Sequence, residues 1–121
     1  MRFDVFFLLL AGVLLVVGVA LGLVMGSTHD FQLAPIHAHI NLVGWASLAI
    51  FGLTYRAFPQ LSTGTLPKVH FGFSSVGALL FPIGLYLAIF RDAPGLAIGS
   101  SMLWLAGAIA FLAQLVRLLR S

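Results

Sequence analysis

The chain alternates between long runs of apolar residues and short polar segments. Each apolar run is long enough to cross a hydrocarbon core of ~30 Å, which takes about 20 helical residues. The predicted helices lie near residues 5–26, 36–57, 69–90 and 96–118. Turn-forming and polar residues gather in the segments between them, 27–35, 59–68 and 91–95. This pattern predicts an all-α integral membrane protein that folds as a bundle of four transmembrane helices.

The short connections also predict how the helices are arranged. Consecutive helices joined by so few residues are expected to pack as antiparallel neighbours. No stretch remains for a further unit, so residues 1–121 are predicted to form a single membrane domain. The first apolar run is interpreted as a retained helix, because it exceeds the ~7–15 residues of a signal-peptide core. Pro82 falls inside the third predicted helix and is expected to bend it.

Composition supports a membrane protein and excludes several kinds of site. Hydrophobic residues make up 61% of the chain and charged residues 7%, so a water-soluble domain could not cover its surface with polar groups. Cysteine is absent, which excludes disulfides, thiolate metal sites and covalent attachment of c-type haem. The net charge of +3 comes from basic residues that lie between or beyond the apolar runs. Membrane lipid is therefore an expected partner, and nucleic acid is not.

The basic residues also predict the orientation of the bundle. Five of the six lie on the side of the two chain ends: Arg2, Arg56, Lys68, Arg117 and Arg120. Only Arg91 lies on the other side. Basic residues are enriched in cytoplasmic loops, so both termini are predicted to be cytoplasmic in a multi-pass protein of the inner (cytoplasmic) membrane.

Two histidines stand out in the segment "IHAHINLVGW", residues 36–45. Each helical residue turns ~100°, so His37 and His39 should point to nearly opposite sides of the second helix. They cannot then chelate one ion, but they suit two separate sites. Imidazole is a good axial ligand for haem iron. Asn41 lies four residues after His37 and could orient its ring.

Other features near the histidines allow two interpretations. Gly44 and Ala46, each seven residues after a histidine, leave room for a flat ligand or for tight helix packing. Polar groups inside a membrane usually face the bundle interior or a cavity, which favours a functional role for His37 and His39. His29 lies beside Asp30 in an outer loop and is interpreted as an interfacial polar residue.

The first helix carries a stripe of small residues, Gly18, Gly22 and Gly26, which lets another helix approach closely. A groove within the chain and a contact between subunits explain the stripe equally well. His70 should lie near the cytoplasmic surface, about a membrane thickness from His39. One cofactor in one subunit therefore cannot bind both His39 and His70.

Two segments carry a resemblance to a known family. "HAHINLVGWASLAIFGLTYRAFP" (37–59) resembles the second transmembrane helix of subunit I of the haem–copper oxygen and nitric oxide reductases, in which an H-x-N segment supplies a haem ligand. "KVHFGFSSVGALLFP" (68–82) is similar to that family's eleventh helix. The resemblance implies that His39 is a haem ligand, that Arg91 pairs with a haem propionate, and that His70 is not a ligand.

The resemblance also implies a fold and limits the activity. The family subunit is similar to three four-helix arcs about a pseudo-threefold axis, and this chain would form one such arc. The tenth helix of the family carries an H-x-H whose histidines serve two haems, a spacing that "HAH" at 37–39 reproduces. The copper-site residues and the acidic proton-channel residues have no counterpart here, so oxygen or nitric oxide reductase activity is not expected.

Together these features predict a small cytochrome b-like membrane protein for electron transfer, haem sensing or haem handling. Haem b would lie between subunits, with His37 of one chain and His39 of the next as axial ligands. A homotrimer is preferred over a dimer because of the resemblance to the threefold family subunit. Both assemblies can form a closed ring in which every His37 and every His39 binds one haem. A cofactor-free accessory or assembly subunit of a respiratory complex is the alternative. A transporter or channel is disfavoured, since the only charged residues in the predicted spans, Arg56 and Arg117, lie at the span ends and leave no charge in their interior.

Overall fold

The computed structural model describes residues 1–121 and contains only helices and connecting turns. The long helices are α1 (Phe3–Thr28), α4 (Leu66–Phe90) and α5 (Gly95–Leu118). The second span is continuous but is built from α2 (Ala34–His39), the π-helix η1 (Ile40–Ala46) and α3 (Ser47–Ala57), and a 3-10 turn, η2 (Pro59–Ser62), follows it. Four helical spans are long and apolar enough to cross a membrane. The prediction of an all-α chain with four such helices is confirmed.

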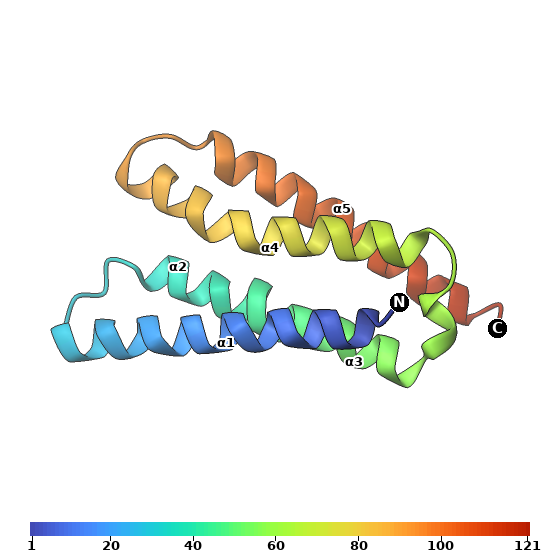
Figure 1. The fold of residues 1–121 in the computed structure, drawn as a ribbon. Helices are drawn as coiled ribbons and strands as arrows, with labels where there is room; N and C mark the ends of the chain where they lie inside the picture. The colour runs from blue at the N-terminus through green and yellow to red at the C-terminus, as the bar shows by residue number, and fades with distance from the viewer.

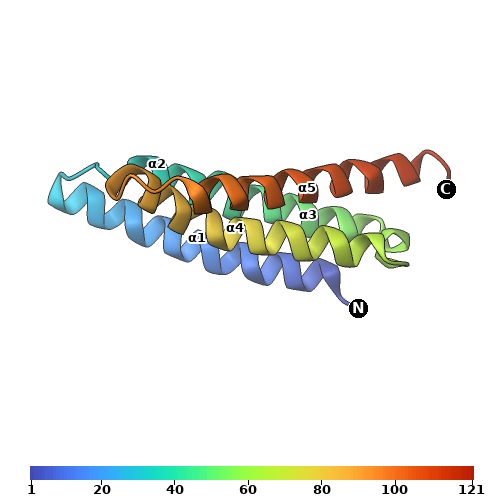
Figure 2. The same cartoon turned by 90° about the horizontal axis from the view of Figure 1, so that it is seen from above.

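The spans pair into two hairpins. The first hairpin consists of α1 packed along η1 and α3, and the second consists of α4 packed along α5. Both termini lie at one end of the bundle together with η2, and this end is here called the terminal end (Figure 1). All four spans run roughly along one long axis of the molecule (Figure 2). The five basic residues named above thus share the terminal end, whereas its assignment to the cytoplasm stays a prediction.

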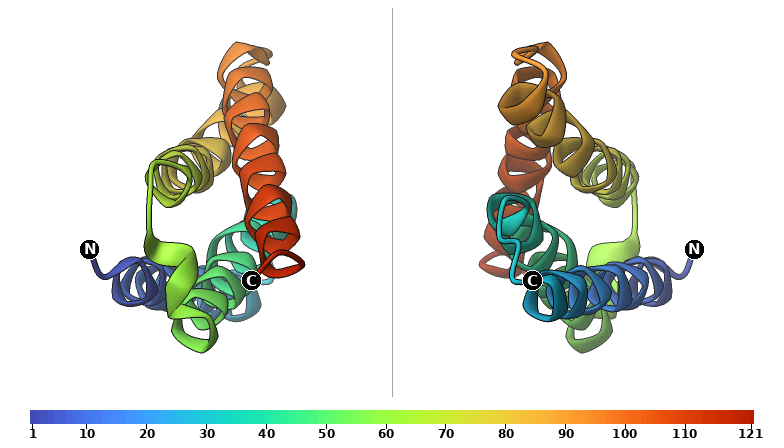
Figure 3. Two further views of the ribbon diagram at one scale, coloured as in Figure 1. Left: turned by 90° about the vertical axis from the view of Figure 1, so that its right-hand side faces the viewer. Right: turned by 90° about the vertical axis from the view of Figure 1, so that its left-hand side faces the viewer.

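The two hairpins diverge away from the terminal end. The C-terminal part of α4 and the start of α5 turn away from the first hairpin (Figures 1 and 3). Pro82 lies inside α4 at this part of the helix, where its ring removes one backbone hydrogen bond and favours a bend. Small residues hold the second hairpin together, since a Cβ added at Gly77 would lie 2.9 Å from the backbone nitrogen of Trp104.

The π-helix η1 was not predicted from the apolar periodicity. The backbone nitrogen of Ser47 bonds to the carbonyl oxygen of Leu42, five residues earlier, and the Ser47 hydroxyl donates to the same oxygen at 2.7 Å. Short π segments inside α-helices are often found at functional sites. In this chain the segment begins directly after His39.

The glycine stripe of α1 serves contacts within the chain. A Cβ at Gly18 would collide with the side chain of Asn41, and a Cβ at Gly22 would lie 2.9 Å from Cε1 of His37. Gly26 has no neighbour within 4 Å. Of the two interpretations of the stripe, the groove within the chain is confirmed for Gly18 and Gly22.

Candidate functional site

His39 ends α2 and faces the second hairpin. Its Nδ1 lies 2.7 Å from the carbonyl oxygen of Pro35, one turn earlier on the same helix. A carbonyl oxygen only accepts, so Nδ1 carries the proton and donates it. Nε2 of the neutral ring then keeps a free lone pair, and no group of the chain bonds to it. A histidine whose other nitrogen donates to a carbonyl is the usual arrangement of a metal-binding imidazole.

A cavity of about 210 Å³ lies beside this ring, between the two hairpins. Its walls come from the second span, α4 and α5: His39, Val43, Phe81, Ser101 and Trp104. The rings of His39 and Phe81 are 5.1 Å apart between centroids. The hydroxyl of Ser101 donates to the carbonyl oxygen of Ile98 at 2.7 Å, so it is already paired. The His39 ring therefore borders a cavity whose walls are apolar.

His37 faces the opposite side, toward α1. Its Nδ1 donates to the carbonyl oxygen of Gly18 at 2.8 Å, and Asn41 Nδ2 donates to its Nε2 at 3.2 Å. The predicted opposite orientation of His37 and His39 and the predicted contact between Asn41 and His37 are both confirmed. Both ring nitrogens of His37 are consequently paired within one chain.

Gly44 packs against α1 rather than beside an open space. A Cβ at this position would lie 2.8 Å from Cδ1 of Leu14. Leu14 itself is buried, with 6% of its surface exposed. Of the two interpretations of Gly44, the structure supports tight helix packing, because a leucine side chain fills the room that this glycine leaves.

Arg91 follows the last residue of α4 and is exposed in the loop before α5. Its side chain makes no hydrogen bond or ion pair within the chain, and Asp92 beside it does not pair with it. It lies ten residues beyond Phe81, which corresponds to about 15 Å along α4 at 1.5 Å per residue. Its guanidinium group remains available to an anion near the end of the bundle opposite the termini.

His70 belongs to a separate, buried polar network near the terminal end. Gln114 Nε2 donates to the Tyr55 hydroxyl at 2.9 Å and to the carbonyl oxygen of Leu61 at 3.0 Å. Because the Tyr55 oxygen accepts from Gln114, its own hydrogen can bond to His70 Nδ1, 2.9 Å away. Side-chain hydrogen bonds thus join α3, which carries Tyr55, to α4 and α5, which carry His70 and Gln114. The network links the two hairpins where they do not diverge.

The surroundings of His70 are aromatic. Its ring lies 4.9 Å from that of Phe7, 4.6 Å from that of Phe51 and 5.4 Å from that of Phe111, centroid to centroid. The side chain is fully buried, and its Nε2 has no hydrogen-bond partner. His70 lies toward the end that carries the termini, as expected, and its side chain is buried inside the bundle.

His70 and His39 do not share a site. Eleven residues separate His70 from Phe81, the neighbour of His39, which is about 16 Å along α4. Sequence reasoning noticed His70 but missed its partners Tyr55 and Gln114. The signal that would have found them is the presence of polar side chains inside apolar spans, since such groups usually bond to one another in a bundle.

The chain contains no group of three or more histidine, cysteine, aspartate or glutamate residues that could hold a metal ion. Comparisons with protein-family models, with curated proteins and with solved structures found no match. The relation to the haem–copper reductases stays a prediction from the residues.

Proposed function

We propose that this chain is a cytochrome b-like membrane protein in which His39 is an axial ligand of haem b. One observation carries the proposal. The His39 ring is held by the Pro35 carbonyl oxygen at 2.7 Å, its Nε2 has no hydrogen-bond partner in the chain, and the ring borders an apolar cavity. Haem iron commonly takes a histidine nitrogen, and such a histidine usually donates its other N–H to a carbonyl.

The walls of the cavity suit the flat apolar face of a porphyrin. Val43, Phe81 and Trp104 present hydrocarbon and aromatic surface, and no buried charge lies there. The volume of about 210 Å³ is below the ~300–1,000 Å³ of typical small-molecule sites. One chain can therefore cover only part of the cofactor, and a second chain must cover the rest. Bound haem b would supply a one-electron couple for electron transfer, or be the cargo of a sensing or handling protein.

The second axial ligand is best supplied by His39 of a second copy. If His37 were the second ligand, it would lose its hydrogen bond to the Gly18 carbonyl oxygen or to Asn41. Nε2 of His39 makes no hydrogen bond in the chain, so its binding to iron breaks none. A twofold axis brings the same surface of two chains together, so two His39 rings can meet across one haem. We propose this dimer in place of the trimer in which His37 meets a neighbouring His39. Arg91, which has no partner in the chain, is the residue proposed for a propionate.

The optical spectrum of the detergent-purified protein tests the proposal. We expect a Soret band, the sharp visible bands of reduced six-coordinate haem, and one haem for two chains by native mass spectrometry. His39→Ala should abolish these bands. His37→Ala is the matched control, since it removes an imidazole two residues away, and should keep them. Loss of haem from His37→Ala with haem retained in His39→Ala would refute the assignment.

A cofactor-free accessory subunit is the second candidate, and one observation favours it. Both nitrogens of His37 are satisfied by Gly18 and Asn41, so half of the histidine pair already has a role in holding α1 against the second span. A folded protein that stays colourless after expression with added haem would establish this alternative and exclude the first.

A further inference from the structure

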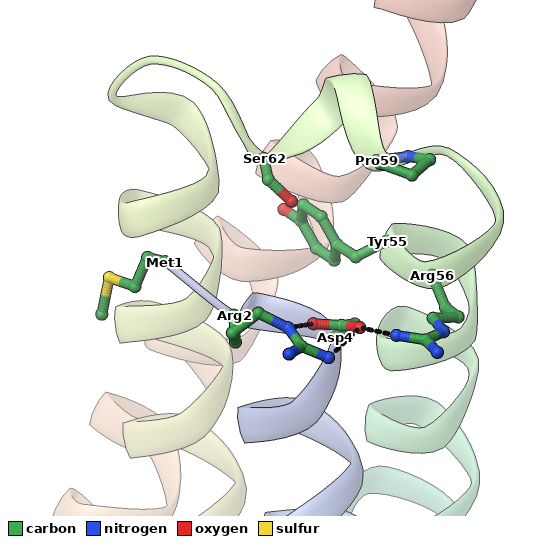
Figure 4. A pocket seen from close by; sticks show the side chains of 7 residues that line it. All are labelled: Met1, Arg2, Asp4, Tyr55, Arg56, Pro59 and Ser62. Atoms are coloured by element: carbon green, nitrogen blue, oxygen red, sulfur yellow. Dashed lines mark hydrogen bonds and ion pairs between the residues drawn. The ribbon is translucent and has the colours of Figure 1, made fainter.

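A second cavity, of about 340 Å³, opens at the terminal end of the bundle. Asp4, in the first turn of α1, lies between two guanidinium groups (Figure 4). Arg2 Nε and Nη2 donate to its two oxygens at 3.2 and 3.3 Å. Arg56, in the last turn of α3, donates from Nη1 at 3.1 Å. Tyr55 and Ser62 also line the cavity (Figure 4).

The charges of this cluster do not balance. Two arginines share one carboxylate, which leaves a net charge of +1. Each guanidinium carries five N–H groups, and most of these are not used by Asp4. The side chains of Arg2 and Arg56 are 64% and 67% exposed, whereas that of Asp4 is 12% exposed. Asp4 thus binds both arginines, and the N–H groups that it does not use remain free at the exposed cavity.

The other groups around the cavity favour an anion with several acceptor oxygens. Both guanidinium groups are permanently cationic, and the hydrogen bond to Asp4 raises the pKa of the Arg2 guanidinium further. The Ser62 hydroxyl makes no hydrogen bond within the chain, whereas the Tyr55 hydroxyl is occupied by His70 and Gln114. Arginine forks match phosphate oxygens in geometry and in charge.

The position of the cavity points to a lipid headgroup. The cluster lies where α1 begins and α3 ends, at the boundary between the apolar spans and water. Phe6 and Leu9, in the next turns of α1, are 40% and 63% exposed, which provides apolar surface for acyl chains beside the charged cavity. Basic pockets at this depth of a membrane protein bind anionic headgroups.

We propose that the cavity formed by Arg2, Asp4 and Arg56 binds a phosphate group, supplied by an anionic phospholipid such as phosphatidylglycerol. This site is independent of the His39 cavity and of the proposed haem. Free inorganic phosphate has the same chemistry and is the other source. Asp4 positions the two arginines and limits the affinity, because its own charge repels the ligand.

Native mass spectrometry of the full chain, released from nanodiscs of equal phosphatidylglycerol and phosphatidylcholine, tests the site. Wild-type protein should retain phosphatidylglycerol in preference to phosphatidylcholine. Arg56→Gln should lower this retention about fivefold, the effect of one basic residue near an anionic headgroup. Arg120→Gln removes the same charge from an exposed residue outside the cavity and should change nothing. Asp4→Asn should raise retention, because it removes the repelling charge.

A parallel titration of the detergent-purified protein with inorganic phosphate identifies the source. One outcome is that phosphate stabilises the wild type but not Arg56→Gln, while the wild type shows no preference for phosphatidylglycerol. That combination would support the phosphate site and identify the free ion as its ligand. Equal losses in Arg56→Gln and Arg120→Gln would show a diffuse charge effect and overturn the proposal. So would a wild-type protein that prefers neither lipid and does not respond to phosphate. Arg2→Gln repeats the test should Arg56→Gln not fold, and it should lower the retention of phosphatidylglycerol in the same way.

Discussion

Replacing His70 by phenylalanine separates the packing role of its ring from the role of its nitrogen atoms. Phenylalanine keeps the ring among Phe7, Phe51 and Phe111, whose centroids lie 4.6 to 5.4 Å away. It removes the acceptor of the Tyr55 hydroxyl. It also removes a buried Nε2 that has no partner. Alanine at the same position removes the ring as well and leaves a cavity.

The two substitutions should differ clearly in their effect on the free energy of unfolding. His70 is fully buried, and deletion of a buried aromatic ring typically costs ~3–5 kcal/mol. His70→Phe should cost only ~1–3 kcal/mol, because the main penalty is an unpaired buried donor on Tyr55. In a double-mutant cycle with Tyr55→Phe, the coupling should be about 0.6 kcal/mol, the average for hydrogen bonds between membrane helices, and at most about 1.7 kcal/mol.

Unfolding by sodium dodecyl sulfate in mixed micelles, followed by circular dichroism, measures these free energies. If His70→Phe destabilised the protein as much as His70→Ala, the packing argument would be wrong. A coupling smaller than ~0.3 kcal/mol, which is the usual error of additivity, would show that the bond to Tyr55 contributes nothing. Any haem spectrum should be the same in wild type and in His70→Phe, since His70 lies about 16 Å along α4 from the neighbour of His39.

Three further predictions concern packing, orientation and the exposed arginine. Gly77→Ala should destabilise the protein by ~1–3 kcal/mol in the same assay, because its Cβ would lie 2.9 Å from the Trp104 backbone. Gly12→Ala is the control: its Cβ would have no neighbour within 4 Å, so the higher helix propensity of alanine should stabilise the protein by up to ~1 kcal/mol. A gain from both would contradict the close approach of α4 and α5. Cysteine introduced at Ala93 should react with an impermeant label only from the periplasmic side, and labelling from the cytoplasm alone would reverse the predicted orientation. Arg91→Leu should weaken haem retention or shift the midpoint potential, and an unchanged potential would show that Arg91 binds no propionate.

Hydropathy and helical geometry predicted the parts of this protein that depend on one helix at a time. An apolar span in a membrane must satisfy its own backbone hydrogen bonds and is therefore helical, so the four spans follow from composition and length. The ~100° turn per residue placed His37 and His39 on opposite sides, since both lie in the regular part of the second span. Local periodicity did not reveal η1, because a π segment changes the turn without changing the apolar character of Ile40–Ala46.

Only the tertiary structure decided which neighbours these residues meet. The pairing of α1 with the second span puts the Gly18 carbonyl oxygen on Nδ1 of His37, and the packing of the second span against α4 and α5 places the His39 ring beside a cavity. The Tyr55–His70–Gln114 network and the cluster of Arg2, Asp4 and Arg56 join residues up to 59 positions apart. The physical reason is that hydropathy sets how deep a residue lies in a membrane, whereas the partner of a buried polar group depends on which helix faces it.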